Sequence, residues 1–192
     1  MRTNDAKLID LVAGHHMLAT RSLVKEAGLS PDQWQRLLRA DIWVPIVPGL
    51  WHHSATVPTW EMKVRAGSTW LGRSAALYGA TAARWWGLEG CTTESVEFLV
   101  PRARRHLPPW LTLHTTSAWT KGDILSHNDV RTSSVTRALI DMARRHSPRE
   151  MEQAIDGAIR LRRTSVPTLT KRMNKLKGRG RNGIRMMRTL LL

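Results

Sequence analysis

The chain has 192 residues and carries 30 Lys and Arg against 15 Asp and Glu, which gives a formal charge of +15 at pH 7 with neutral histidines. A hydrophobic fraction of 42% is ordinary for a globular protein and argues against wholesale disorder. The single cysteine, Cys91, excludes an internal disulfide framework and a multi-cysteine zinc site. No window approaches about 18 uninterrupted apolar residues, and the first residues lack the apolar core of a secretory signal. We therefore expect a cytoplasmic protein that does not enter a membrane.

The first part of the chain predicts a helix-turn-helix. Apolar residues recur at helical spacing in 5–15, and a second short helix is expected over 21–27, ended by Gly28. A third helix begins at Ser30, where proline follows and Gln33 is placed to close a capping box. Two short helices joined by a glycine-containing turn are typical of a helix-turn-helix, whose second helix enters the major groove of DNA.

A hairpin follows in the position of a wing. The β-prone runs 42–47 and 50–52 are separated by Pro48 and Gly49. We expect the third helix to read base edges, because Arg pairs with guanine and Gln with adenine, and the wing and a later arginine cluster to contact phosphates. The residues expected to contact DNA are Ser30, Gln33, Gln35, Arg36, Arg39, Trp51, His52, His53, Arg102, Arg104 and Arg105. The alternative is a small helical domain of another kind.

The rest of the chain predicts helices around a small sheet. Helices are expected over 59–71 and 74–86, strands over 94–100 and 111–115, and a short strand near 130–132, together forming a small antiparallel sheet. Four amphipathic helices follow, and their expected ranges are 135–142, 150–159, 166–176 and 184–192. The expected fold class is α+β, with an N-terminal winged helix-turn-helix followed by a mainly helical domain that contains this sheet.

The expected domain organisation is a winged helix-turn-helix over 1–57, an α/β domain over 58–178, and a basic linker with a terminal helix over 179–192. The positive charge is uneven across these parts. Residues 1–57 have a net charge of +1, whereas residues 160–192 contain 11 basic residues and no acidic one. Such clustering favours a polyanionic partner, because each Lys or Arg on a phosphate releases counterions. The alternative is a solvated helix face with a loose tail.

Several segments in a fixed order carry a resemblance to a known family. They are the wing end 48–51, the run 74–79, the strand 96–102 with its arginines, and the segment 130–143, which reads VRTSSVTRALIDMA. In this order they resemble the AbiEi family of abortive-infection antitoxins and its actinobacterial winged-helix relatives, over essentially the whole chain.

The resemblance implies a DNA-binding antitoxin that represses its own operon and opposes a nucleotidyltransferase-like toxin encoded beside it. The implied partner is double-stranded DNA at its own promoter, in inverted repeats, bound by a monomer or weak dimer. Relatives often continue into a Vsr-like endonuclease domain after a linker such as 178–183, and this sequence stops nine residues later. Two alternatives stay open: the targeting remnant of such a nuclease, and a nonspecific nucleic-acid-binding protein.

No pattern in the sequence predicts catalysis, a cofactor or a metal site. The adjacent pairs His15-His16 and His52-His53 point apart on regular structure and seldom share a metal. Asp141 lies four residues after Arg137, as in an ion pair on a helix surface. No nucleophile elbow or phosphate loop surrounds the serines and histidines. We therefore expect a protein that binds and does not catalyse.

Overall fold

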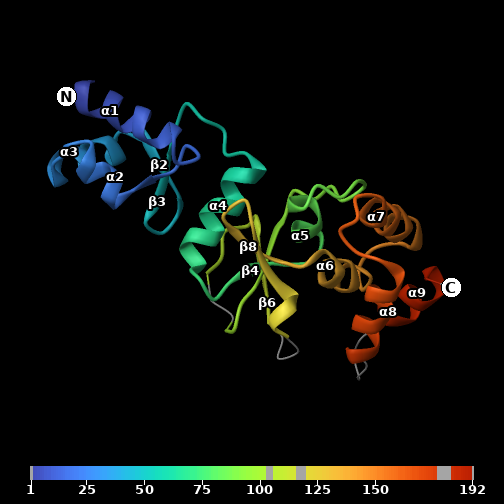
Figure 1. The fold of residues 1–192 in the computed structure, drawn as a ribbon. Coiled ribbons are helices and arrows are strands. Elements are labelled where there is room, and N and C mark those ends of the chain that lie inside the picture. The colour runs from blue at the N-terminus through green and yellow to red at the C-terminus, as the bar shows by residue number, and fades with distance from the viewer. Residues whose placement is uncertain (1, 103–105, 116–119, 177–182, 192) are drawn as a thin grey trace. The chain divides into compact units, whose positions relative to one another are not determined.

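The computed structural model describes residues 2–102, 106–115, 120–176 and 183–191. The chain forms two compact units, Met1–Gly72 and Arg73–Leu192 (Figure 1). The α+β class predicted from the sequence is confirmed, since helices accompany a separate sheet in each unit. Within the described residues, no helix combines the length and apolar character needed to cross a membrane.

The first unit has the element order of a winged helix-turn-helix. Its helices are α1 (Arg2–Ala13), α2 (Arg21–Glu26), α3 (Pro31–Arg39) and α4 (Trp60–Leu71). Its strands are β1 (Ala19–Thr20), β2 (Trp43–Val47) and β3 (Leu50–His53), and they form an antiparallel sheet in the order β1-β3-β2. The hairpin β2–β3 is the predicted wing, and α2 and α3 are the predicted pair of short helices.

Local sequence signals determine where these helices begin and where the chain turns between elements. Thr20, Ser30 and Thr59 are N-caps whose hydroxyl oxygens accept hydrogen bonds from backbone N–H groups in the first turns of α2, α3 and α4. Gly28 has a φ of +82°, so the turn between α2 and α3 uses the left-handed region that glycine adopts at low cost. Gly49, with a φ of +85°, does the same in the wing turn.

The core of the first unit is built around three tryptophans. Trp34 of α3 lies with its ring centroid 5.3 Å from Trp51 of β3 and 5.9 Å from Trp43 of β2. Trp43 is 1% exposed, and its Nε1 donates a hydrogen bond to Asp5 Oδ1 at 2.9 Å, which ties α1 to the sheet. The division between the units falls at Gly72, so α4 belongs to the first unit, whereas the predicted boundary at residue 57 precedes that helix.

The second unit combines a five-stranded sheet with a helical layer. Its strands are β4 (Ala76–Leu77), β5 (Val96–Leu99), β6 (Leu111–His114), β7 (Ile124–His127) and β8 (Val130–Ser133). Its helices are α5 (Gly79–Trp85), the short 3-10 helix η1 (Lys121–Asp123), α6 (Val135–Met142), α7 (Pro148–Arg160), α8 (Val166–Lys175) and α9 (Gly183–Leu190).

The sheet has the strand order β6-β5-β4-β8-β7 and is mixed. Strands β5 and β6 run parallel, as do β4 and β8, so the expectation of an antiparallel sheet is corrected. Strand β6 therefore begins at the same end of the sheet as β5, as a parallel neighbour does. The helix expected over 74–86 is also corrected: its first part is β4, and helix starts only at Gly79.

Helix α6 is the centre of the helical layer. It contacts α5, α7, α8 and α9, and it follows β8 directly in the chain (Figure 1). A Cβ at Gly183 would lie 2.6 Å from the backbone carbon of Ala143, so only glycine lets α9 approach the end of α6 this closely. Helix α9, expected from the sequence as part of a separate tail, is therefore packed into this unit through Ile184 and Met187.

Candidate nucleic-acid interface

The outward face of α3 carries the groups expected to read DNA. Trp34 and Leu37 are buried, which leaves Gln35, Arg36 and Arg39 exposed together on the opposite side of the helix. Arg36 Nε donates a weak hydrogen bond to the Asp32 carbonyl oxygen at 3.4 Å. These three side chains are long, polar and exposed, so they can reach base edges from a helix lying in the major groove.

Ser30 and Gln33 have a local role at the start of α3. The Gln33 N–H donates to Ser30 Oγ at 3.2 Å, and the Ser30 N–H donates to Gln33 Oε1 at 2.8 Å. This is the reciprocal capping box expected from the sequence. Both side chains act as acceptors in this box, which leaves the Ser30 O–H and the Gln33 Nε2–H groups unused by it. Their contact with DNA stays a prediction.

The wing residues singled out from the sequence lie mostly inside. Trp51 and His52 are each 9% exposed, and Trp51 packs edge-on against Trp34. His52 Nδ1 lies 3.0 Å from the His53 carbonyl oxygen, and His53 Nδ1 accepts from the Ala55 N–H at 3.2 Å. The His53 ring also meets Trp43 edge-on. The exposed residues of the wing include Pro45 of β2 and the turn, Pro48 and Gly49, whose backbone can approach a phosphate.

The arginine cluster expected to contact phosphates belongs to the second unit. Arg102 is exposed just after β5. Arg104 and Arg105 lie outside the described residues. The structure therefore brings Gln35, Arg36 and Arg39 together on α3, whereas Arg102 belongs to the other unit.

Helix α2 adds two cations that the sequence analysis did not single out. Arg21 and Lys25 are exposed and four residues apart, so they lie on one side of α2. Among the described residues, neither side chain takes part in a recorded ion pair. Two basic residues spaced four apart in the short helix before the Gly28 turn are the sequence signal that could have identified them.

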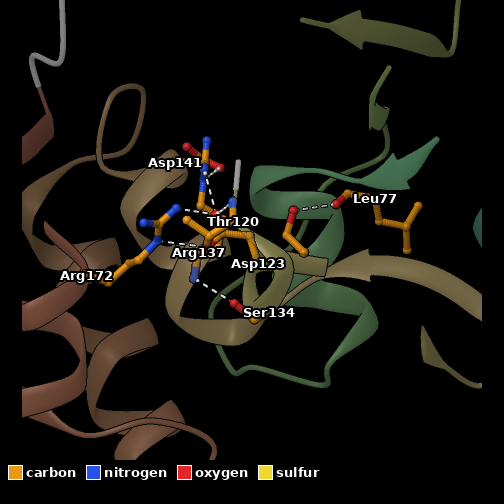
Figure 2. Close-up of polar contacts among 8 residues, drawn as sticks. Leu77, Thr120, Asp123, Ser134, Arg137, Asp141 and Arg172 are labelled. Atoms are coloured by element: carbon orange, nitrogen blue, oxygen red, sulfur yellow. Dashed lines mark hydrogen bonds and ion pairs between the residues drawn. The ribbon is translucent and has the colours of Figure 1, made fainter. Parts of the chain in front are cut away.

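The second unit contains a buried cluster of charges, called here the Asp123 cluster and made of Asp123, Arg137, Asp141 and Arg172 (Figure 2). Arg172 of α8 donates from Nε to Asp123 Oδ1 at 2.7 Å and also bonds Oδ2 through Nη2. Arg137 of α6 donates from Nε to Asp141 Oδ2 at 2.7 Å, and its Nη1 lies 3.4 Å from Asp123 Oδ2.

Backbone groups complete the environment of Asp123. The Thr120 N–H donates to Asp123 Oδ2 at 2.8 Å, and the Ser134 N–H donates to the Asp123 carbonyl oxygen at 2.8 Å. Asp123 is 2% exposed and Arg137 is 3% exposed. Burial disfavours the charge on Arg137, but the bond to Asp141 and the charges of both aspartates outweigh it and raise its pKa. The cluster joins η1, α6 and α8 and is satisfied internally, which is the signature of a structural element.

A polar arrangement around Tyr78 lies next to the Asp123 cluster, because Tyr78, Arg137 and Asp141 line the same cavity. The rings of Tyr78 and His114 are 4.4 Å apart, and His114 Nε2 lies 2.6 Å from Glu97 Oε2, which also faces Arg145 Nη1 at 3.4 Å. Burial, followed by the charge of Asp141, raises the pKa of the Tyr78 hydroxyl, so the phenol stays protonated. A cavity of about 80 Å³ beside Tyr78 has room for small solvent molecules.

Groups able to hold a metal or attack a substrate are scarce in the part of the chain that the structure describes. No three His, Cys, Asp or Glu residues gather there as metal ligands. Burial, with a contribution from Glu150, raises the pKa of the Cys91 thiol to about 11, so it is not a thiolate at neutral pH.

The basic end of the chain is partly exposed. Arg172 belongs to the Asp123 cluster, Arg160 Nη2 pairs with Glu89 Oε2 at 2.5 Å, and the Arg163 guanidinium lies over the Trp86 ring at 5.5 Å. The remaining described cations of this region are exposed, and they are Arg162, Lys171, Lys175, Arg185 and Arg188.

Comparison with known proteins adds information on the fold. No protein-family model matches the chain, and no curated protein matches its sequence. Among solved structures, the RV2827C protein from Mycobacterium tuberculosis is similar, with a TM-score of 0.64, 19% sequence identity, and coverage of 98% of this chain and 76% of that one. At this identity the likeness concerns the fold, including both units.

Proposed function

We propose that this protein is a DNA-binding transcriptional regulator. The observation that supports the proposal is the face of α3, where Gln35, Arg36 and Arg39 are exposed together at the place where a winged helix-turn-helix presents its recognition helix. Arginine contacts guanine through two hydrogen bonds and glutamine contacts adenine in the same way, so this face offers both chemistries.

The remaining surface of the first unit fits a supporting role. Arg21 and Lys25 of α2 supply charge that positions a helix on the phosphate backbone without reading sequence. The wing turn at Pro48 and Gly49 supplies a narrow exposed tip beside the helix. The first 57 residues have a net charge of only +1, so we expect specific contacts to contribute more here than general attraction.

The test compares operator with scrambled DNA. Arg36→Ala and Arg39→Ala should each reduce the preference for the DNA upstream of the gene by about 1–3 kcal/mol, roughly 5-fold to 150-fold, because a bidentate base contact is lost. Fluorescence anisotropy with both duplexes measures the preference. Arg149→Ala, at an exposed arginine of α7, is the matched control and should leave it unchanged. Equal binding of both duplexes by the unmodified protein contradicts the proposal.

We further propose that the regulator is an antitoxin of the AbiEi kind and acts in the cytoplasm, where its DNA lies. This step rests on the resemblance carried by segments 48–51, 74–79, 96–102 and 130–143. It would repress its own operon and oppose a nucleotidyltransferase-like toxin by binding, without catalysis of its own. Co-expression with a toxin gene found beside its own should restore growth. Growth arrest that persists while both proteins are made at normal levels contradicts the antitoxin role. It does not affect the proposal of DNA binding.

A second candidate function is general binding of nucleic acid through the basic end of the chain. The observation that favours it is the set of exposed cations on α8 and α9 in a region of 33 residues that contains no acidic residue. Charge removal at Lys171, Lys175, Arg185 and Arg188 should weaken binding of operator and random DNA equally and reduce the salt dependence. A selective loss of operator binding contradicts this function.

A further inference from the structure

A groove runs along one flank of the helix-turn-helix. It lies between α2, α3 and β3, has a volume of about 450 Å³, and is lined within the first unit. Its apolar lining includes Leu29, Trp34, Leu38 and Trp51. This volume falls in the range of sites that hold small organic molecules, about 300–1,000 Å³.

The polar part of the lining has one sign of charge. Arg21 and Lys25, four residues apart on α2, form one side of the groove, and the described lining contains no carboxylate. Both side chains are exposed, and no ion pair is recorded for either of them among the described residues. A ligand that fits this arrangement has an anionic group directed at α2 and an apolar body directed away from it.

The apolar part favours an aromatic body. Trp34 and Trp51 meet edge-on, with ring centroids 5.3 Å apart and an interplanar angle of 88°. Both indole rings line the groove, and a flat ring packs well against the accessible part of an indole. Leu38 of α3 and Leu29 of the turn add aliphatic contacts from neighbouring sides.

We propose that this groove binds a small aromatic carboxylate that acts as an effector of DNA binding. Gln35 lines the groove and also belongs to the exposed face of α3, so an occupant contacts the same side chain that is expected to reach DNA. The ligand also neutralises Arg21 and Lys25, which are expected to contact phosphates. Binding of the carboxylate therefore opposes binding of the operator. This regulatory part rests on the proposed function, whereas occupation of the groove does not.

The experiment follows the indole N–H signals of the full chain by two-dimensional NMR during titration with indole-3-acetate, 2-naphthoate and 4-phenylbutyrate. The nine tryptophans act as probes spread over both units. Selective shifts of the Trp34 and Trp51 signals are expected, with those of Trp85 and Trp86 unchanged. The neutral analogue indole-3-ethanol should bind about tenfold more weakly than indole-3-acetate, because it lacks the charge that α2 recognises.

The matched variants separate charge recognition from general attraction. The double substitution Arg21→Gln with Lys25→Gln should weaken indole-3-acetate binding about tenfold, whereas Arg162→Gln with Lys171→Gln should not change it. All four positions are exposed, so the variants should fold. The absence of shifts at Trp34 and Trp51 with all three carboxylates at millimolar concentration overturns the site. Equal binding of indole-3-ethanol, or no effect of the α2 substitutions, overturns the assignment of a carboxylate.

Operator affinity measured with and without indole-3-acetate tests the effector role. A rise of several-fold in the dissociation constant for operator DNA is expected, and an unchanged constant at saturating ligand overturns regulation. If the protein binds no operator at all but the NMR shifts occur, the proposed function fails and the ligand site stands. If the α2 substitutions weaken only DNA binding, Arg21 and Lys25 serve phosphates alone and the inference fails.

Discussion

The two units differ in whether charged side chains form part of the interior. In the first unit, the arginines of α2 and α3 are exposed and the core is held by tryptophans, with Trp34 in contact with both Trp43 and Trp51. In the second unit, Arg137 and Asp123 are almost fully buried, and charges join the helices. A unit held by aromatic contacts keeps its cations available for a partner, whereas the Asp123 cluster uses its cations internally. Basic composition alone therefore does not locate a binding surface.

The strongest test of this contrast is Asp123→Ala. It removes the shared partner of Arg137 and Arg172, and an unpaired buried charge is expected to cost about 3–5 kcal/mol of stability. Hydrogen exchange of the full chain measures the loss in the second unit. The control Glu61→Gln disrupts the ion pair between the exposed Glu61 and the partly buried Arg65, and it should cost at most about 1 kcal/mol. Similar effects of the two substitutions would show that the cluster is not important for stability.

The next test addresses the aromatic core. Trp43→Phe keeps an aromatic ring but removes the N–H that bonds Asp5, together with part of the buried volume. We expect a loss of about 1–3 kcal/mol confined to the first unit. Hydrogen exchange is again the measurement, because two units need not unfold as one. Equal loss of protection in the second unit contradicts the separation of the two cores.

A smaller effect is expected at the start of α3. Ser30→Ala removes the side chain that accepts from the Gln33 N–H and should lower stability by about 1 kcal/mol. Thermal unfolding monitored by tryptophan fluorescence gives the change. Ser54→Ala, at an exposed serine after the wing, is the control. If operator binding falls without a change in stability, Ser30 contacts DNA directly, as the sequence predicted.

The smallest effect is a pH dependence in the second unit. The His127 ring stacks on Trp86 with centroids 4.1 Å apart, and partial burial followed by the charge of Arg163 lowers its pKa from 6.5. The unfolded chain then binds the proton more readily than the folded one, so His127 stabilises the fold above about pH 6.5 and this contribution is lost as the pH falls through its folded pKa. Thermal unfolding at pH 7.5 and 5 should show it, and His127→Asn should reduce the difference.

The first unit could be predicted closely from the sequence because its signals are local. The capping box at Ser30, the glycine at residue 28 and the Pro48-Gly49 turn each determine their own neighbourhood. The exposed face of α3 followed from helical spacing alone. The burial of His52 did not, since it depends on which residues the sheet packs against.

The second unit was harder because its structure depends on distant pairing. Ala75, Ala76 and Leu77 favour helix by composition, yet β4 forms because Leu77 pairs with Phe98 and with Thr132. Strand β7 was missed, although Asn128 and Asp129, both with positive φ, mark a tight hairpin turn before β8.

The Asp123 cluster also depends on pairing between distant residues, so the sequence predicts only part of it. The Arg137–Asp141 pair was expected from its spacing of four residues, but on a helix surface, whereas it is buried. An arginine within the apolar stretch of α6 was the available signal. That Asp123 and Arg172 join it could not be read from the sequence, because their pairing spans 49 residues.

The position of β4 has a consequence for how the chain folds as it is synthesised. The sheet of the first unit closes through a hairpin and the pairing of Ala19 with Trp51, all within residues already made when β4 emerges. Strand β4 must wait for β5 and then for β8, which is made much later. Sheets with distant partners form slowly and expose apolar edges meanwhile. The first unit can therefore assemble early, whereas Ala76 and Leu77 stay without their sheet partners until β5 and then β8 have been made.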